Sequence, residues 1–253
     1  MKLYHYTTLD SFAKIWVSKQ LKFSPPQNTN DLFEREKLLH ILRSLMYDLR
    51  PCDFQIPIQD YWDYFHEVLF GFKQISLVCD YEDSPGYKSP LMWGQYAHNE
   101  QGVCIEFDSD KIPNLEGVYS SKVYYVTIVP FIDIPKPIAC GKEDIRNLIL
   151  KNKDAFFFTK HKHWEHENEY RIVSDKDDFL KIEDAITCVY IANNHHVNTQ
   201  VVERLVNDEV HVKYIQTYVF SNSKGFPDID RTAFRHFNKK INEEPFKSQM
   251  HKK

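Results

Sequence analysis

Residues 168–192 read NEYRIVSDKDDFLKIEDAITCVYIA, and they hold two strand-like runs with no helical stretch between them. The runs NEYRIV and TCVYIA are rich in β-branched and aromatic residues, which are typical of strands. Strands that follow one another directly are typical of antiparallel pairing, whereas a doubly wound parallel sheet alternates strands with helices. This stretch therefore indicates an α+β fold.

Further strands and helices are expected on both sides of this stretch. Alternation in LYHYT at residues 3–7 predicts a strand with Leu3, His5 and Thr7 on one face. Other strands are expected at residues 75–79, 102–107, 122–131 and 214–220, and helices at 11–19, 32–47, 59–70, 91–97, 145–158 and 199–208. We expect a single domain over residues 1–253, with a helical insertion at about 31–72 and a basic tail at about 231–253.

Scarcity of glycine excludes two large classes of nucleotide-binding protein. The chain has seven glycines, and no two lie closer than eight positions apart. Neither G-x-G-x-x-G nor G-x-x-x-x-G-K-[ST] can therefore occur, which excludes a Rossmann dinucleotide site and a P-loop. The five cysteines are scattered without a C-x-x-C pair, so neither a disulfide scaffold nor a cysteine zinc site is expected.

Charge and hydropathy favour a cytoplasmic protein with no membrane partner. The start MKLYHYTTLDSFAK lacks the apolar core of a signal peptide, and the uncharged apolar stretch at 123–132 is too short to span a bilayer. The formal net charge is −4, yet residues 231–253 carry seven lysines and arginines against two glutamates. Such a tail is either a solvated end or a contact for nucleic acid.

The densest polar cluster is KHKHWEHENEYR at residues 160–171. On a strand over 167–173, Glu167, Glu169 and Arg171 would share one face, with the two carboxylates about 7 Å apart. One carboxylate could then be held by hydrogen bonds while the other stabilises a cationic transition state. The alternative is a solvent-facing ladder of glutamate and arginine. The histidines at 161, 163 and 166 lack the spacing and companion ligands of a metal site, so no metal is expected.

Three other positions offer both a functional and a structural interpretation. His5 could bind ribose hydroxyls with Thr7 beside it, or it could be a packed histidine on an edge strand. Asp31 lies in a loop that could bind a ligand or cap the next helix. Trp93 and Tyr96 share one helix face, as a stacking wall for a base or as part of the core.

Three blocks of the chain together resemble a bacterial family known as domain of unknown function 2971. The blocks are LYHYTT…LKFSPPQNTNDLFE, ISLVCDYEDS…LMWGQYAHNEQGVCIEFD and KHKHWEHENEYRI, and they occur in the family's order over roughly residues 3–220. More remotely, the opening L-Y-H-x-T, the S-P-L-M segment and the late E-x-E resemble mono-ADP-ribosyltransferases of the DNA-modifying toxin type.

The second resemblance implies a fold, a substrate and a set of site residues. The fold would be a core of two packed, split β-sheets with peripheral helices, and the substrate NAD. Glu169 would be the catalytic carboxylate and Glu167 its auxiliary. The side chains implied to bind NAD, with the middle motif left open between two of them, are His5, Thr7, Ser76, Trp93 and Tyr96. The same resemblance implies a toxin or phage-defence effector that modifies nucleic acid or protein, or an NAD glycohydrolase, with a possible antitoxin or regulatory partner.

Two other functions remain open on the sequence. In a non-enzymatic binding or regulatory module, Lys160 or Arg171 would neutralise Glu167 and Glu169 through close ion pairs. A Mg²⁺-dependent nuclease would instead need at least two acidic side chains to converge on a metal. The candidates for that metal are Asp31, Glu34, Glu106 and Glu169. For a nucleic-acid acceptor, Lys160, His161 and Lys162 could form a basic rim beside the E-x-E strand.

Overall fold

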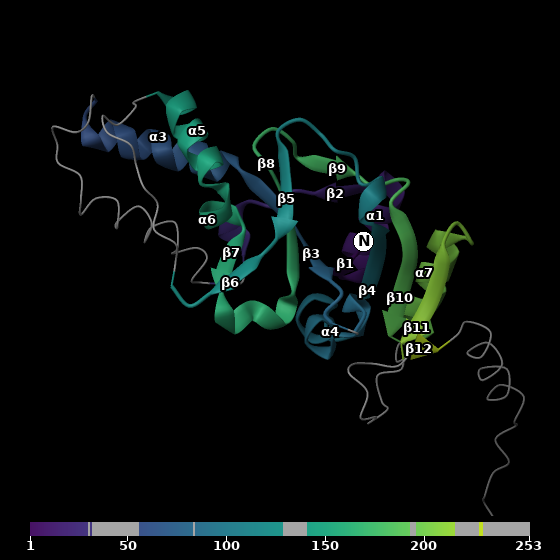
Figure 1. Cartoon of the computed structure of the whole chain (residues 1–253). Helices are drawn as coiled ribbons and strands as arrows, with labels where there is room; N and C mark the ends of the chain where they lie inside the picture. Colours follow the sequence, from purple (N-terminus) through teal and green to yellow (C-terminus); the bar gives the residue numbers. More distant parts are fainter. Residues whose placement is uncertain are drawn as a thin grey trace, which may run out of the picture.

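The computed structural model describes residues 1–29, 31, 56–82, 84–128, 141–192, 196–215 and 228–229 (Figure 1). Within these residues eight strands form one sheet, in the order β12-β11-β10-β4-β1-β3-β8-β5. Every neighbouring pair is antiparallel except β10 and β11. The strands are β1 (Lys2–Thr7), β3 (Lys73–Cys79), β4 (Val103–Asp108), β5 (Val118–Lys122), β8 (Glu169–Ser174), β10 (Ile186–Ala192), β11 (His211–Ile215) and β12 (Asp228–Ile229).

Helices cover both faces of this sheet and extend one end of it. The helices are α1 (Leu9–Ser18), α3 (Ile58–Gly71), α4 (Pro90–Tyr96), α5 (Lys142–Lys151), α6 (Lys153–Phe157) and α7 (His196–Val206). Apolar residues of α1 and α7 pack on one face of the sheet, and those of α4 pack in a separate core with Tyr4 and Tyr6. Helices α3, α5 and α6 form a third aromatic core against Val173 of β8, at one end of the molecule (Figure 1).

Two short ladders lie beside the large sheet. Strand β2 (Gln20–Lys22) pairs with β9 (Phe179–Lys181), and β6 (Tyr124–Val126) pairs in parallel with β7 (Thr159–His161). Two backbone hydrogen bonds between Ser24 and Gln74 tie the chain after β2 to β3. The β2 segment therefore lies next to the start of β3.

The α+β class is confirmed, but the expected division into two packed sheets is not. The described strands of the central sheet are joined by one continuous series of ladders. Strand β1 lies in the middle of it, between β4 and β3, so the prediction that it is an edge strand is wrong. Of the predicted insertion at 31–72, Asp31 and residues 56–72 are described, and the tail at 231–253 lies outside the described residues.

One junction in the sheet is nevertheless open. Among the described residues the ladder between β1 and β3 pairs two positions, Leu3 with Cys79 and Tyr4 with Val78. Strand β1 continues to Thr7 and β3 starts at Lys73, so the two strands separate at this end. Backbone groups and side chains of both strands thus face a space that a fully paired sheet would not have.

Candidate functional site

A cavity of about 530 Å³ occupies the opening between β1 and β3. Its walls come from β1, β3, α1, the β2 segment, α4, β7 and β8. Six of the seven side chains that the sequence nominated for catalysis or NAD binding line it: His5, Thr7, Ser76, Tyr96, Glu167 and Glu169. The structure therefore brings together residues that lie up to 164 positions apart, from His5 to Glu169.

Trp93 is the seventh nominated side chain, and it does not line the cavity. Its side chain is 0% exposed, and its indole N–H donates a hydrogen bond of 2.8 Å to the carbonyl of Tyr87. Its ring meets Tyr6 edge-on at 5.3 Å between centroids. The proposed stacking role of Trp93 is replaced by core packing, because the helix turns this residue toward the sheet.

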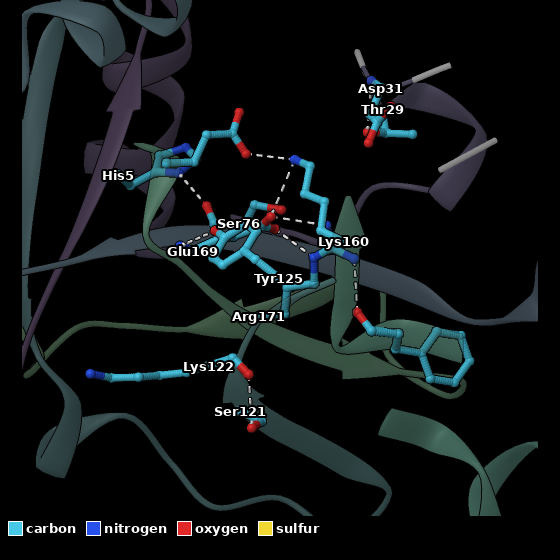
Figure 2. Close-up of polar contacts among 12 residues, drawn as sticks. His5, Thr29, Asp31, Ser76, Ser121, Lys122, Tyr125, Lys160, Glu169 and Arg171 are labelled. Atoms are coloured by element: carbon cyan, nitrogen blue, oxygen red, sulfur yellow. Dashed lines mark hydrogen bonds and ion pairs between the residues drawn. The ribbon is translucent and has the colours of Figure 1, made fainter. Parts of the chain in front are cut away.

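Glu169 begins β8 and is held by a buried arginine two residues along the same strand face. Arg171 donates from Nε to Oε1 of Glu169 at 2.5 Å and from Nη2 to Oε2 at 2.9 Å. Its Nη1 donates to the carbonyl of Phe157 at 2.8 Å, which fixes the guanidinium from behind. Figure 2 shows Arg171 and Lys160 converging on Glu169. Glu169 and Arg171 are 4% and 1% exposed, so this is a buried ion pair.

Glu167 reaches the same place from a different element. The predicted strand over 167–173 begins only at Glu169, because residues Lys162–Glu167 form a 3₁₀ helix and Asn168 takes a left-handed backbone conformation. Glu167 accepts a hydrogen bond of 2.6 Å from the hydroxyl of Tyr96 and one of 2.5 Å from Lys160 Nζ. The two carboxylates meet because of this turn, not because they share a strand face.

Lys160 lies between the two carboxylates. Its Nζ is 2.5 Å from Glu167 Oε2 and 3.4 Å from Glu169 Oε2, and the ring of Trp164 lies 4.8 Å from it. The lysine is 6% exposed. The prediction that Lys160 belongs to an exposed basic rim is therefore wrong, because its ammonium group is buried in the cavity wall and pairs with the two glutamates.

The pKa of Glu169 reflects this pairing. Burial raises it, but the charge and hydrogen bonds of Arg171, the charge of Lys160 and a hydrogen bond from the Ser76 side chain lower it further, to about 2. Glu169 is therefore ionised at neutral pH. Among the described residues, two carboxylates face two cations in this cluster, so their formal charges cancel.

His5 supplies a neutral group on the opposite wall of the cavity. Burial lowers the pKa of its imidazole, and a hydrogen bond with the Ser76 carbonyl opposes this shift. Its Nδ1 lies 3.4 Å from that carbonyl oxygen. Because a carbonyl only accepts, this contact needs the proton on Nδ1 and leaves Nε2 as an acceptor. Ser76 is exposed on the cavity floor.

The acidic set proposed for a metal does not assemble in the described part of the chain. Glu106 accepts hydrogen bonds from Tyr190 at 2.6 Å and Thr187 at 2.8 Å, pairs with Lys2 at 3.1 Å, and does not line the cavity. Glu34 lies outside the described residues. Among the described residues, no group of three or more His, Cys, Asp or Glu side chains is placed to hold a metal ion.

Two residues that support the site carried no functional signal in the sequence. Tyr125 of β6 accepts a hydrogen bond of 2.8 Å from the backbone N–H of Glu169 through its hydroxyl. Asn168 donates from its side chain to the carbonyls of Cys79 and Asp80. Tyr125 lies in an aromatic run that predicts only a strand, and its pairing with β7 is a long-range contact. The tendency of asparagine toward the left-handed region was the one available signal for Asn168.

The fold and the cavity define an α+β protein with an ion-paired polar pocket at an opening of its central sheet. Residues 92–172 match the family model described as Protein of unknown function (DUF2971), which supports the resemblance to that family. The matched segment contains Tyr96 and the cluster from Lys160 to Arg171, and it excludes His5 and Ser76. No curated protein matches the chain, and no solved structure matches it. The resemblance to ADP-ribosyltransferases is not confirmed.

In the part of the chain that the structure describes, no helix combines the length and the apolarity that a bilayer crossing requires.

Proposed function

We propose that the chain is a binding module for a nucleotide of the size and chemistry of NAD, and that its cavity holds the ligand without cleaving it. The observation that carries this proposal is the matching of Glu167 and Glu169 by Lys160 and Arg171. Cleavage of the nicotinamide–ribose bond develops positive charge on the sugar, as glycoside cleavage does. A carboxylate already neutralised by a bidentate arginine attracts that charge weakly, because the arginine repels it.

The chemistry of the cavity favours a nucleotide over other small ligands. Its inner wall offers hydroxyl, imidazole and carboxylate groups, which suit ribose hydroxyls and amide groups. Two further lysines line the cavity and are exposed, Lys14 of α1 and Lys22 of β2. Lys14 pairs with Asp10 at 2.6 Å, so we assign the attraction of a phosphate group to Lys22. A volume of about 530 Å³ lies within the range of small-molecule sites.

The first experiment measures NAD binding by calorimetry and nicotinamide release by chromatography on the same preparation. We expect saturable binding with one NAD per chain and no release above the uncatalysed rate. Filling the cavity with Ser76→Trp should abolish binding. The control is Ser120→Trp, which places the same bulk on an exposed serine of β5 outside the cavity. Equal loss of binding in both variants would contradict the assignment of the site.

A second candidate is an NAD-cleaving transferase or glycohydrolase. It is favoured by one observation, namely that His5, Tyr96, Glu167 and Glu169 line the same cavity. In that case the wild type would release nicotinamide, and Glu169→Gln would slow release by about 10²–10³, the usual effect of removing a fixed electrostatic partner. Release by the wild type overturns the non-enzymatic proposal, and absence of NAD binding overturns both.

The phosphate contact gives a separate prediction. We expect Lys22→Gln to weaken NAD binding by roughly 2–5-fold, the size of one exposed charge contact, and to leave adenosine binding unchanged. The matched control is Lys181→Gln, because Lys181 is exposed on β9, the partner strand of β2, and does not line the cavity. Calorimetry at low and high salt measures both effects. An equal loss for NAD and adenosine would show that Lys22 does not contact phosphate.

A further inference from the structure

We infer that Asn168 is the positioning residue that brings both carboxylates of the cavity onto Lys160. This inference rests on the proposed function, since it assigns a role within the same binding site. Asn168 separates Glu167, the last residue of the 3₁₀ helix, from Glu169, the first residue of β8. Its backbone has φ 42° and ψ 54°, in the left-handed region.

This backbone conformation changes where the two glutamates point. In a continuous strand, side chains at i and i+2 stand parallel and about 7 Å apart. Here the chain turns at Asn168, and Glu167 Oε2 and Glu169 Oε2 approach the same ammonium group at 2.5 and 3.4 Å. The remaining oxygen of Glu167 then meets the hydroxyl of Tyr96 at 2.6 Å. With an extended backbone at position 168, the side chain of Glu167 would stand parallel to that of Glu169 on the strand face and would point away from Tyr96.

The side chain of Asn168 anchors this turn to the wall of the cavity. Its Nδ2 donates to the carbonyl of Cys79 at 3.1 Å and to that of Asp80 at 2.7 Å. Its carbonyl accepts from the N–H of Cys79 at 2.9 Å. Cys79 ends β3, the strand that carries Ser76 into the cavity.

Asparagine meets both requirements of this position. Among residues with a side chain it tolerates the left-handed region best, and glycine tolerates it more easily still. Glycine would keep the turn and lose both amide hydrogen bonds, whereas alanine would lose the bonds and strain the backbone. The two substitutions therefore separate the anchoring role from the conformational one.

The test compares Asn168→Gly and Asn168→Ala with Asn207→Ala. Asn207 follows α7, also has a left-handed backbone with φ 46°, and does not line the cavity. Asn168→Ala and Asn207→Ala should both lower thermal stability, because both place alanine in the left-handed region, and Asn168→Ala should lower it more because it also loses two hydrogen bonds. We expect Asn168→Gly to weaken NAD binding about tenfold, the effect of losing two hydrogen bonds. Asn168→Ala should weaken it further, because its backbone is also strained, and Asn207→Ala should leave it unchanged. Wild-type binding in Asn168→Gly would overturn the inference.

A second readout keeps the inference testable if the wild type binds no NAD, in which case the proposed function fails on its own. Selective ¹³C labelling of glutamate carboxyls allows the pKa of Glu169 to be followed by NMR. In Asn168→Ala the strained turn should move the carboxylate of Glu169 away from Lys160, so its pKa should rise above the wild-type value of about 2. Asn168→Gly keeps the turn and loses only its anchoring, so it should give a smaller rise. An unchanged pKa of Glu169 in both variants would overturn the positioning role whatever the ligand.

Discussion

Replacing Arg171 with methionine is expected to lower the free energy of unfolding by about 3–5 kcal/mol, the usual effect of breaking a buried ion pair. The hydrogen bonds of Arg171 include two to Glu169 and one to the carbonyl of Phe157. Without it, Glu169 would stay buried with Lys160 at 3.4 Å as its nearest cation. An incompletely paired buried carboxylate destabilises the folded state, because its desolvation is no longer compensated.

Urea unfolding of Arg171→Met and of the double variant Arg171→Met/Glu169→Met measures this effect. The double variant should recover most of the lost stability, since an apolar pair of similar volume often replaces a buried ion pair at little cost. Lys142→Met is the control. Lys142 is half exposed and pairs with Glu67 at the surface, so its loss should stay below about 1 kcal/mol. A similar loss for the two single variants would contradict the buried-pair account.

The regular elements of the fold were predictable because they depend on local patterns. Alternation in LYHYT corresponds to β1, with Leu3 in one core and Tyr4 in the other. The apolar spacing of Phe12 and Trp16 corresponds to the buried side of α1, and Thr8 caps that helix through its side chain. These features involve neighbours within a few residues, which a sequence pattern records directly.

The strand order and the opening in the sheet were not predictable in the same way. Strand β1 pairs with β4, about 100 residues away, and only briefly with β3. Such pairings depend on which apolar faces are buried together, and no local pattern encodes them. The cavity follows from this incomplete pairing. Its walls come from strands and helices that lie far apart in the chain, so no local pattern could predict them.

Some residues of the site could be named from the sequence, whereas the role of others depends on long-range packing. His5, Ser76 and Glu169 meet in one cavity, as the resemblance implied, although they come from distant parts of the chain. Trp93 and Tyr96 lie on one short helix, and the packing of Tyr6 against Trp93 decides which of them is buried. The pattern alone left that choice open, since both interpretations use the same spacing.

Pairing of charges favours one of the functions that the sequence left open. The sequence leaves both an NAD-cleaving enzyme and a binding module open, since two glutamates near a strand suit a cationic transition state unless cations neutralise them. The proposed sign of a binding module was close ion pairs to Lys160 or Arg171, and both occur. We therefore place binding first and retain cleavage as the second candidate. Release of nicotinamide by the wild type distinguishes the two candidates.

Acidification should reveal the same ion pair through the pH dependence of stability. The pKa of Glu169 is about 2 in the folded protein and 4.5 in its ordinary state. The folded state thus binds this proton less readily than the unfolded state, so the stabilisation is complete above about pH 5. It is lost as the pH falls from there toward 2. The difference in pKa corresponds to about 3 kcal/mol.

Urea unfolding at pH 7, 5, 4 and 3 tests this prediction against the double variant Arg171→Met/Glu169→Met, which lacks the pair. Burial also lowers the pKa of His5. Protonation of His5 therefore destabilises the folded state below about pH 6.5, in the wild type and in the double variant alike. Subtracting one curve from the other removes this contribution and leaves that of the ion pair. The wild-type free energy of unfolding minus that of the double variant should be constant between pH 7 and 5 and should then fall steadily toward pH 3, in favour of the double variant. Parallel curves down to pH 3 would show that Glu169 is not held in its charged form by Arg171 and Lys160.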